Sequence, residues 1–331
     1  MAEIVLGFAS SHGPTMNTPP ERWHELGEKD TRDTRFDFSS LHPKAGIEQE
    51  ITLDKMRERY AAVQQGIAAL GQVMRDAAPD VIVVFSNPHG GVTTDLMQPT
   101  FGIHLNDTPP HTEGAGMRGA SGNVQTQDGP RTARDAKTAE GGPQSRDFKQ
   151  YPTDGELARH LMRGLIEEEI DVAANFQSQP GAGLDGAYNL LFQQFEKEAN
   201  IPYVPVLISR YMPNQATPRR VYRFGQAVRR VIDRWDSSKR VAVMGSGGLS
   251  HQVIDEELDH KVIDALEEGD EEGLFSIDVE QLNRAPGTPE ILNWVACAGV
   301  MAPKTMTLID YIPCYRSLAG TGHGNTFGYW Q

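Results

Sequence analysis

The sequence predicts an α/β fold, with a mostly parallel or mixed central sheet and helices on both faces. Two observations support this fold class. Short apolar runs typical of buried strands alternate with longer segments in which apolar residues recur every three or four positions. Several of these runs lead directly into polar, glycine-containing turns, as strands do at the edge of an open sheet. Because 331 residues can bury a large core, we expect one domain over residues 1–331.

The strands are predicted first. Residues 4–8, 81–85, 203–209 and 241–244 are runs rich in β-branched and other apolar residues, and residues 172–174 form a shorter run. Runs of this length without alternation are typical of strands that are covered on both faces. We therefore expect these runs to be strands of the central sheet.

The helices follow from the apolar spacing. Apolar residues recur at helical steps over residues 56–74, 157–166 and 221–235, and Thr52 is a suitable cap for the first of these. A fourth helix is expected near residue 288, with Thr288 as its cap and Pro289 at its first position. Strands that alternate with such helices predict crossover connections.

Two segments lack a clear period. Residues 15–50 are rich in Pro, Asp, Arg and His, and residues 105–152 are rich in Gly, Thr, Ser, Asp and Pro. We expect the second segment to be a flexible insertion or lid within the domain. A cover over a functional crevice and a solvated surface loop both fit its composition.

Composition excludes several classes of function. The formal net charge of −14 argues against nucleic acid as a partner, because a phosphate backbone repels an acidic protein. No apolar run approaches the length that spans a bilayer, and no secretory leader is recognised, so the sequence predicts a cytoplasmic protein without membrane contact. The two cysteines, Cys297 and Cys314, have no zinc-site spacing, and Cys297 is interpreted as a buried apolar residue.

Three histidines each follow one of the predicted strands. His12 follows residues 4–8, His89 follows residues 81–85, and His251 follows residues 241–244 and a glycine-rich turn. Because the carboxyl ends of parallel strands share one edge of a sheet, these imidazoles are expected to converge there. His12 and His89 form the natural imidazole pair of a mononuclear iron site with two histidines and one carboxylate. The alternative for each is a histidine that stabilises a tight turn.

Glu290 is the candidate carboxylate ligand. It falls in the first turn of the helix expected after Thr288, where the helix dipole favours the ionised form. The alternative is that Glu290 serves only this dipole. His251 is either a third ligand or a general acid/base, since the preceding glycines are not a dinucleotide fingerprint. His323, in the glycine-rich stretch 320–324, is interpreted as part of the tail, and a reach into the site stays open.

Four segments in this order resemble the signature regions of the class III extradiol ring-cleaving dioxygenases, the relatives of the protocatechuate 4,5-dioxygenase β subunit. They are residues 10–14, 85–89, 245–252 and 289–294. Residues 18–23, 213–220 and 319–322 look closest to the single-chain methylgallate/gallate-type members. The resemblance runs along the chain except for the insertion around residues 105–150, and it implies a single catalytic α/β domain of the β-subunit type.

The resemblance implies roles for four residues. His12 and His89 resemble the histidine ligands of Fe(II), Glu290 resembles the carboxylate ligand, and His251 resembles the histidine that moves protons near dioxygen. The implied reaction is Fe(II)-dependent extradiol (meta) cleavage of a catecholic aromatic acid, similar to protocatechuate, gallate or methylgallate, with incorporation of both atoms of O2. The family also implies a homodimer.

The chain departs from the family pattern at two positions. Pro88 stands where the family usually has Asp, and Ala182 stands where many members carry a second pocket histidine. Two other classes of function therefore stay open: a non-oxidative metal-dependent hydrolase or lyase on the same scaffold, and a non-enzymatic binding protein. Arg219 and Arg220 are either anchors for a substrate carboxylate or solvent-facing residues.

Overall fold

The computed structural model describes residues 1–32, 44–87, 99–105, 110–112, 148–175, 186–197, 200–210 and 212–331. The predictions made at Pro88, His89 and Ala182, and most of the predicted insertion at 105–152, lie outside the described residues.

Within the described residues, a mixed sheet of nine strands forms the centre of the structure, with eight in the order β10-β11-β1-β8-β2-β7-β3-β6 and β9 paired to β11. Its strands are β1 (Glu3–Ser10), β2 (Val81–Ser86), β3 (Phe101–His104), β6 (Ala173–Asn175), β7 (Tyr203–Ile208), β8 (Arg240–Ser246), β9 (His251–Val253), β10 (Thr307–Tyr315) and β11 (Thr321–Trp330). A separate pair joins β4 (Pro110–Thr112) to β5 (Phe148–Gln150).

Strand direction divides the sheet into two parts. Strands β1, β8, β2 and β7 are mutually parallel, so their carboxyl ends meet at one edge. Strand β11 runs antiparallel to β1, β9 and β10. On the other side, β3 runs antiparallel to β7 and parallel to β6. This confirms the α/β class with a mixed sheet.

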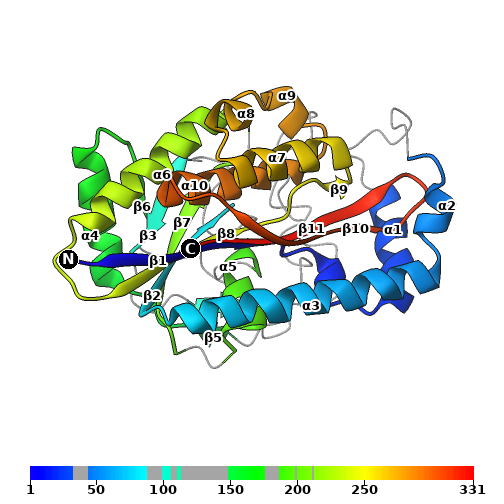
Figure 1. Ribbon diagram of the computed structural model, residues 1–331, viewed down its shortest axis with the longest axis horizontal. Helices are drawn as coiled ribbons and strands as arrows, with labels where there is room; N and C mark the ends of the chain where they lie inside the picture. The colour runs from blue at the N-terminus through cyan, green and yellow to red at the C-terminus, as the bar shows by residue number, and fades with distance from the viewer. Residues whose placement is uncertain are drawn as a thin grey trace, which may run out of the picture.

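Helices cover both faces of the sheet (Figure 1). The α-helices are α1 (Trp23–Thr31), α2 (Ile47–Glu50), α3 (Leu53–Ala77), α4 (Gly155–Glu167), α5 (Gly186–Leu190), α6 (Pro218–Asp233), α7 (Glu256–Glu268), α8 (Glu271–Phe275), α9 (Val279–Leu282) and α10 (Ile291–Met301). Short 3-10 turns lie at η1 (Pro14–Met16), η2 (Pro20–Arg22) and η6 (Thr288–Glu290), and a π-helical turn lies at η5 (Leu191–Phe195).

The core consists of two layers separated by the sheet. Along β2, Val81, Val83 and Phe85 pack into the layer that contains residues of α4, α6, α7 and α10, whereas Ile82 and Val84 pack into the layer that contains residues of α3 and η5. All five side chains are fully buried. This explains the continuous apolar run, because both faces of an interior strand are covered.

Most of the predicted elements are confirmed. Thr52 caps α3 by accepting a hydrogen bond from the backbone N–H of Lys55. The predicted helices at 157–166 and 221–235 correspond to α4 and α6, and the predicted strands correspond to β1, β2, β6, β7 and β8. Cys297 is fully buried, as its apolar surroundings indicate.

Two local predictions are wrong. The segment 15–50 contains α1 and α2, which the sequence pattern missed because α1 buries only Trp23 and Gly27 and so has little apolar period. Thr288 is not a helix cap. It is the first residue of the 3-10 turn η6, which leads into α10 and has Gly287 at its cap position. A Cβ on Gly287 would lie 2.0 Å from Cδ2 of His251, so this turn packs directly on that imidazole.

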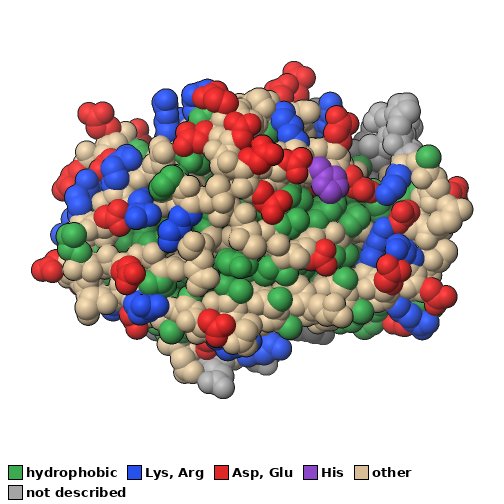
Figure 2. Space-filling view, viewed as in Figure 1, with side chains coloured by type: hydrophobic (Ala, Val, Ile, Leu, Met, Phe, Trp, Pro, Cys, Tyr) green, Lys and Arg blue, Asp and Glu red, His purple; other side chains and the backbone are tan. Residues whose placement is uncertain are grey.

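Acidic side chains gather over α7 and α8 on the face shown in Figure 2, in keeping with the net charge of −14. The same face shows a band of hydrophobic side chains across its middle. Within the part of the chain that the structure describes, no helix has the length and apolarity needed to cross a membrane.

Candidate metal centre and active site

Three of the four predicted site residues meet at the carboxyl edge of the parallel strands. His12 follows β1, His251 begins β9 after the turn that leaves β8, and Glu290 ends η6. Nε2 of His12 lies 3.1 Å from Oε2 of Glu290, and Nε2 of His251 lies 3.4 Å from Oε1 of the same carboxylate. His89, the fourth, lies outside the described residues.

Glu290 is a fully buried carboxylate. Burial raises its pKa, but the neighbouring imidazoles of His12 and His251 outweigh burial and hold the pKa well below its usual range. Nη1 of Arg210, just beyond the end of β7, lies 3.7 Å from Oε1 and adds positive charge. The backbone at Gly247, with φ of +147°, passes so close that a Cβ there would lie 2.8 Å from Cβ of Glu290.

Hydrogen bonds fix the tautomer of His12. The hydroxyl of Ser246 donates to the carbonyl of Ala187 at 2.6 Å, so Ser246 Oγ acts as the acceptor for Nδ1–H of His12 at 3.2 Å. In the neutral ring, Nε2 then carries the lone pair and points at Glu290 Oε2. Two electron-pair donors 3.1 Å apart require a cation between them, either a proton or a metal ion.

Buried amides hold this edge together. Nδ2 of Asn293 donates to Oδ1 of Asn87 and to the carbonyl of Ser246, both at 2.6 Å, and Nδ2 of Asn87 donates to the carbonyl of Ile208 at 2.7 Å. Nε1 of Trp294 donates to the carbonyl of Gly247 at 2.8 Å. These bonds join β2, β7, β8 and α10, so the helix that follows Glu290 is fixed to the strand ends.

His251 is oriented by a second buried network. Its Nδ1–H donates to the carbonyl of Leu249 at 3.3 Å, which leaves the lone pair of the neutral ring on Nε2. Asp259 on α7 accepts from the backbone N–H of Ser250 at 2.6 Å, from its hydroxyl at 2.7 Å and from the hydroxyl of Tyr311 at 2.7 Å. Burial raises the pKa of Asp259 to about 7, although these hydrogen bonds oppose the rise.

The structure favours the second of the two interpretations of His323, in which it reaches the site. His323 pairs directly with His251 across β11 and β9, and the two rings stack with centroids 5.1 Å apart and planes 14° from parallel. Nη1 of Arg316 donates to Nδ1 of His323 at 3.0 Å, and Arg316 is itself held by Asp30 at 2.5 and 3.0 Å. Burial, with the charge of Arg316 next in size, holds the pKa of His323 well below its usual range.

Arg219 and Arg220 lie away from the site. Arg219 pairs with Glu272 at 2.9 Å and stacks over the ring of Phe275, and Arg220 lies over Phe101. The structure therefore favours the interpretation of Arg219 as a surface residue. The arginine that reaches the site is Arg210, which sequence reasoning did not select.

The spacing of His12 Nε2 and Glu290 Oε2 suits two ligands of one metal ion. Two ligands that each lie about 2.0–2.2 Å from one ion are about 3 Å apart when they occupy adjacent positions. The 3.1 Å between His12 Nε2 and Glu290 Oε2 matches that spacing. Among the described residues, no group of three or more His, Cys, Asp or Glu side chains is placed to hold a metal ion.

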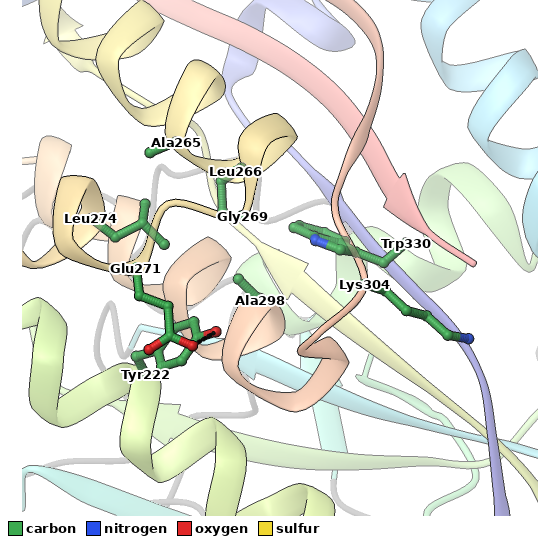
Figure 3. Close-up of a pocket in the computed structure, with 9 residues that line it drawn as sticks. All are labelled: Tyr222, Ala265, Leu266, Gly269, Glu271, Leu274, Ala298, Lys304 and Trp330. Carbon is green, nitrogen blue, oxygen red and sulfur yellow. Dashed lines mark hydrogen bonds between the residues drawn. The ribbon is translucent and has the colours of Figure 1, made fainter.

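A small pocket elsewhere is unrelated to this chemistry. It is lined by residues of α6, α7, α8, α10 and β11, among them Tyr222, Glu271, Lys304 and Trp330 (Figure 3). No imidazole lines it, and the hydroxyl of Tyr222 already donates to Glu271 at 2.9 Å. The cluster around Glu290, not this pocket, combines imidazoles with a buried carboxylate.

Residues 47–325 match the family model described as the catalytic LigB subunit of aromatic ring-opening dioxygenase. The match covers Glu290, His251 and His323, and it extends over most of the chain. The chain belongs to this family. The LigB family is the class III extradiol dioxygenase family that the four sequence segments resemble.

Curated relatives carry related names. A 2,3-dihydroxyphenylpropionate/2,3-dihydroxicinnamic acid 1,2-dioxygenase of Cupriavidus necator is 30% identical over 205 residues, which are 60% of this chain and 52% of the relative. A protein of that name, numbered 1, from Dechloromonas aromatica (strain RCB) is 23% identical over 74% of this chain and 84% of its own. A gallate dioxygenase of Pseudomonas putida is 27% identical over half of each chain.

The match to the Cupriavidus necator protein spans about half of that relative's length. A crystal structure of an uncharacterized protein from Escherichia coli K12 aligns with 98% of this chain and 99% of its own at 15% identity, with a TM-score of 0.44. That likeness is too low to bear on fold or function.

Proposed function

We propose that this LigB-family protein is a non-haem Fe(II)-dependent extradiol dioxygenase that opens the ring of a catecholic aromatic acid and incorporates both atoms of O2. One observation supports the proposal above all others. His12 is held in the tautomer whose Nε2 lone pair faces the buried Glu290 carboxylate at 3.1 Å, with the imidazole of His251 3.4 Å from the same carboxylate. Metal donors and a proton-transfer group therefore share one edge of the sheet.

The proposed ligands are His12, Glu290 and, by resemblance, His89. Two imidazoles and a carboxylate are the donor set of non-haem Fe(II) oxygenases that leave positions open for substrate and dioxygen. When bound, Fe(II) supplies positive charge that favours the deprotonated catechol, and it mediates electron transfer between the ring and dioxygen. Glu290 is already poised for this role, because its surroundings keep it ionised.

His251 is the proposed general acid/base. Its Nδ1–H is committed to the carbonyl of Leu249, so Nε2 accepts a phenolic proton from the substrate and returns it to the product. The contacts of Ser250 with Asp259 fix the backbone immediately before the ring, and Gly287 packs on its Cδ2–Nε2 edge. The imidazole can therefore take up and release a proton without moving away from the site.

Oxygen consumption tests the reaction. Protein purified without oxygen and loaded with Fe(II) is mixed with protocatechuate, gallate, 3-O-methylgallate or 2,3-dihydroxyphenylpropionate, the last because relatives are named for it. We expect oxygen uptake equal to substrate loss and a new near-UV or visible absorbance from a ring-opened product. Bound iron without oxygen uptake on this panel, combined with substrate loss, would instead indicate a non-oxidative lyase or hydrolase.

We also propose that the protein is a homodimer, on the family resemblance alone. Light scattering during gel filtration measures the molar mass directly. A mass near twice the 36.5 kDa of one chain is the expected result, and a mass near 36.5 kDa would contradict it.

A further inference from the structure

His323 lies beside His251 in the cluster around Glu290. Their rings stack because the two residues are cross-strand partners, and His251 in turn contacts Glu290. The Cδ2–Nε2 edge of His323 lies over Gly13, the residue that follows His12: a Cβ on Gly13 would be 2.3 Å from Cδ2 and 2.8 Å from Nε2. The glycine at position 13 therefore leaves the space in which His323 approaches the metal-binding edge.

The hydrogen bond from Arg316 determines which ring nitrogen of His323 carries the proton. A guanidinium has donors and no acceptor, so the contact from Arg316 Nη1 requires Nδ1 of His323 to accept. The proton of the neutral ring is then on Nε2. Among the described residues, none accepts a hydrogen bond from that Nε2–H.

Arg316 cannot easily turn away to change this arrangement. Its side chain is 3% exposed, and its Nε and Nη2 both donate to the carboxylate of Asp30 on α1, whose side chain is 11% exposed. Paired guanidinium–carboxylate bonds of this kind fix geometry as well as charge. A fixed cation beside Nδ1 also opposes protonation of His323.

We propose that His323 is a substrate-binding residue whose Nε2–H donates a hydrogen bond to an anionic ring oxygen of the bound catechol. The two stacked imidazoles then divide the work, since His251 exchanges a proton through Nε2 whereas His323 only donates. A donor that does not lose its proton favours an oxygen that already carries negative charge. This inference rests on the proposed function, because it requires a catecholic ligand.

Binding of 4-nitrocatechol under nitrogen tests the inference without turnover. The visible spectrum of this probe reports whether its hydroxyls are ionised, so one titration of the Fe(II)-loaded protein gives both the dissociation constant and the ionisation state. The informative pair is H323L, which removes the donor, and H323Q, which keeps an N–H donor of similar reach. H24L, at an exposed histidine of α1, is the control.

For H323L we expect binding weaker by about 10-fold or more, with a smaller ionised fraction of the bound probe, because a hydrogen bond to a charged group is lost. H323Q is expected to stay within about threefold of the unaltered protein, and H24L to match it. Iron content and the thermal midpoint identify misfolded samples, and H323M, whose flexible side chain fills the same space, is used if H323L does not fold.

Two outcomes overturn the inference in distinguishable ways. If the unaltered protein binds 4-nitrocatechol and folded H323L or H323M binds it equally well with the same spectrum, His323 does not contact the ring oxygen and the proposed function stands. If the unaltered, iron-loaded protein does not bind 4-nitrocatechol, the proposed function and this inference fail together.

Discussion

The two parts of the sheet place their histidines near Glu290 in different ways. In the parallel part, His12 lies just past the end of β1, at an edge where buried strands end. In the antiparallel part, His323 lies within β11. It joins the cluster around Glu290 because its register pairs it with His251. A strand end can be recognised in a sequence, whereas a cross-strand register depends on which distant segments pair. The antiparallel part therefore contains the residue of the proposed site, His323, whose position the sequence left open.

The largest effect is expected in the parallel part. E290Q keeps the shape of the side chain and removes the charge that faces His12. Metal affinity should fall by more than about 100-fold, since even residues that only support metal ligands contribute 10–100-fold. Competition with a chelator measures this, with E280Q on the exposed surface of α9 as control. Full iron occupancy in E290Q would remove Glu290 from the proposed ligand set.

The next effect concerns His251, which belongs to both parts because it follows β8 and pairs with β11. H251A should lower kcat by roughly 10²–10⁴-fold, the usual contribution of a positioned acid/base group. Iron content should stay unchanged. H24A serves as the matched control, and oxygen uptake provides the rate. A kcat within about twofold of the unaltered protein would exclude His251 as the proton-transfer group.

A smaller effect is expected at Ser246, which fixes the His12 tautomer from the end of β8. S246A removes the acceptor of Nδ1–H, and metal affinity should fall by roughly 10–100-fold. S238A, at an exposed position before β8, is the comparison. If S246A binds iron as tightly as S238A does, the tautomer is not held by this hydroxyl.

The smallest effect is expected at Asp259, which supports the antiparallel part. At pH 5 the folded protein keeps a proton on Asp259, whose pKa is about 7, whereas the unfolded carboxyl, with its ordinary pKa of 3.8, has lost it. Its contribution to stability is therefore present below about pH 4 and is lost as pH rises through about 7.

Urea unfolding of D259N measures this contribution. At pH 5 we expect a loss of about 1–3 kcal/mol in the free energy of unfolding, because buried donors of Ser250 and Tyr311 lose their acceptor. At pH 8 the difference from the unaltered protein should be smaller. The exposed neighbour variant E257Q should show no such dependence. An equal difference at both values of pH would contradict the raised pKa.

The sequence predicted what depends on local pattern. The run 81–85 identified β2 because an interior strand is apolar on both faces, and Thr52 identified the start of α3 because its hydroxyl satisfies a backbone donor. His12 and His251 were brought together by one rule, that the carboxyl ends of parallel strands share an edge. Glu290 was selected from its place in the first turn of a predicted helix. The proposed ligand His89 stays a prediction.

The rest depends on tertiary contacts. Helix α1 has little apolar period, and its contacts lie far along the chain, as in the pairing of Asp30 with Arg316. The 3-10 turn that carries Glu290 begins after Gly287, which packs against His251. No local pattern reports either contact. The same holds for Ser246, whose hydroxyl acts on His12 from a different strand.

The position of β11 also has a consequence for how the protein folds as it is made. This strand is the last in chain order, yet it lies inside the sheet between β10 and β1. Ser10 of β1 pairs with Phe327 of β11. A nascent chain that has emerged as far as α10 already carries His12, His251 and Glu290, while β1 still has an open edge. The pairing of β11 with β1 and β9 must wait until residues 321–330 leave the ribosome, so folding of this edge is a late, long-range event.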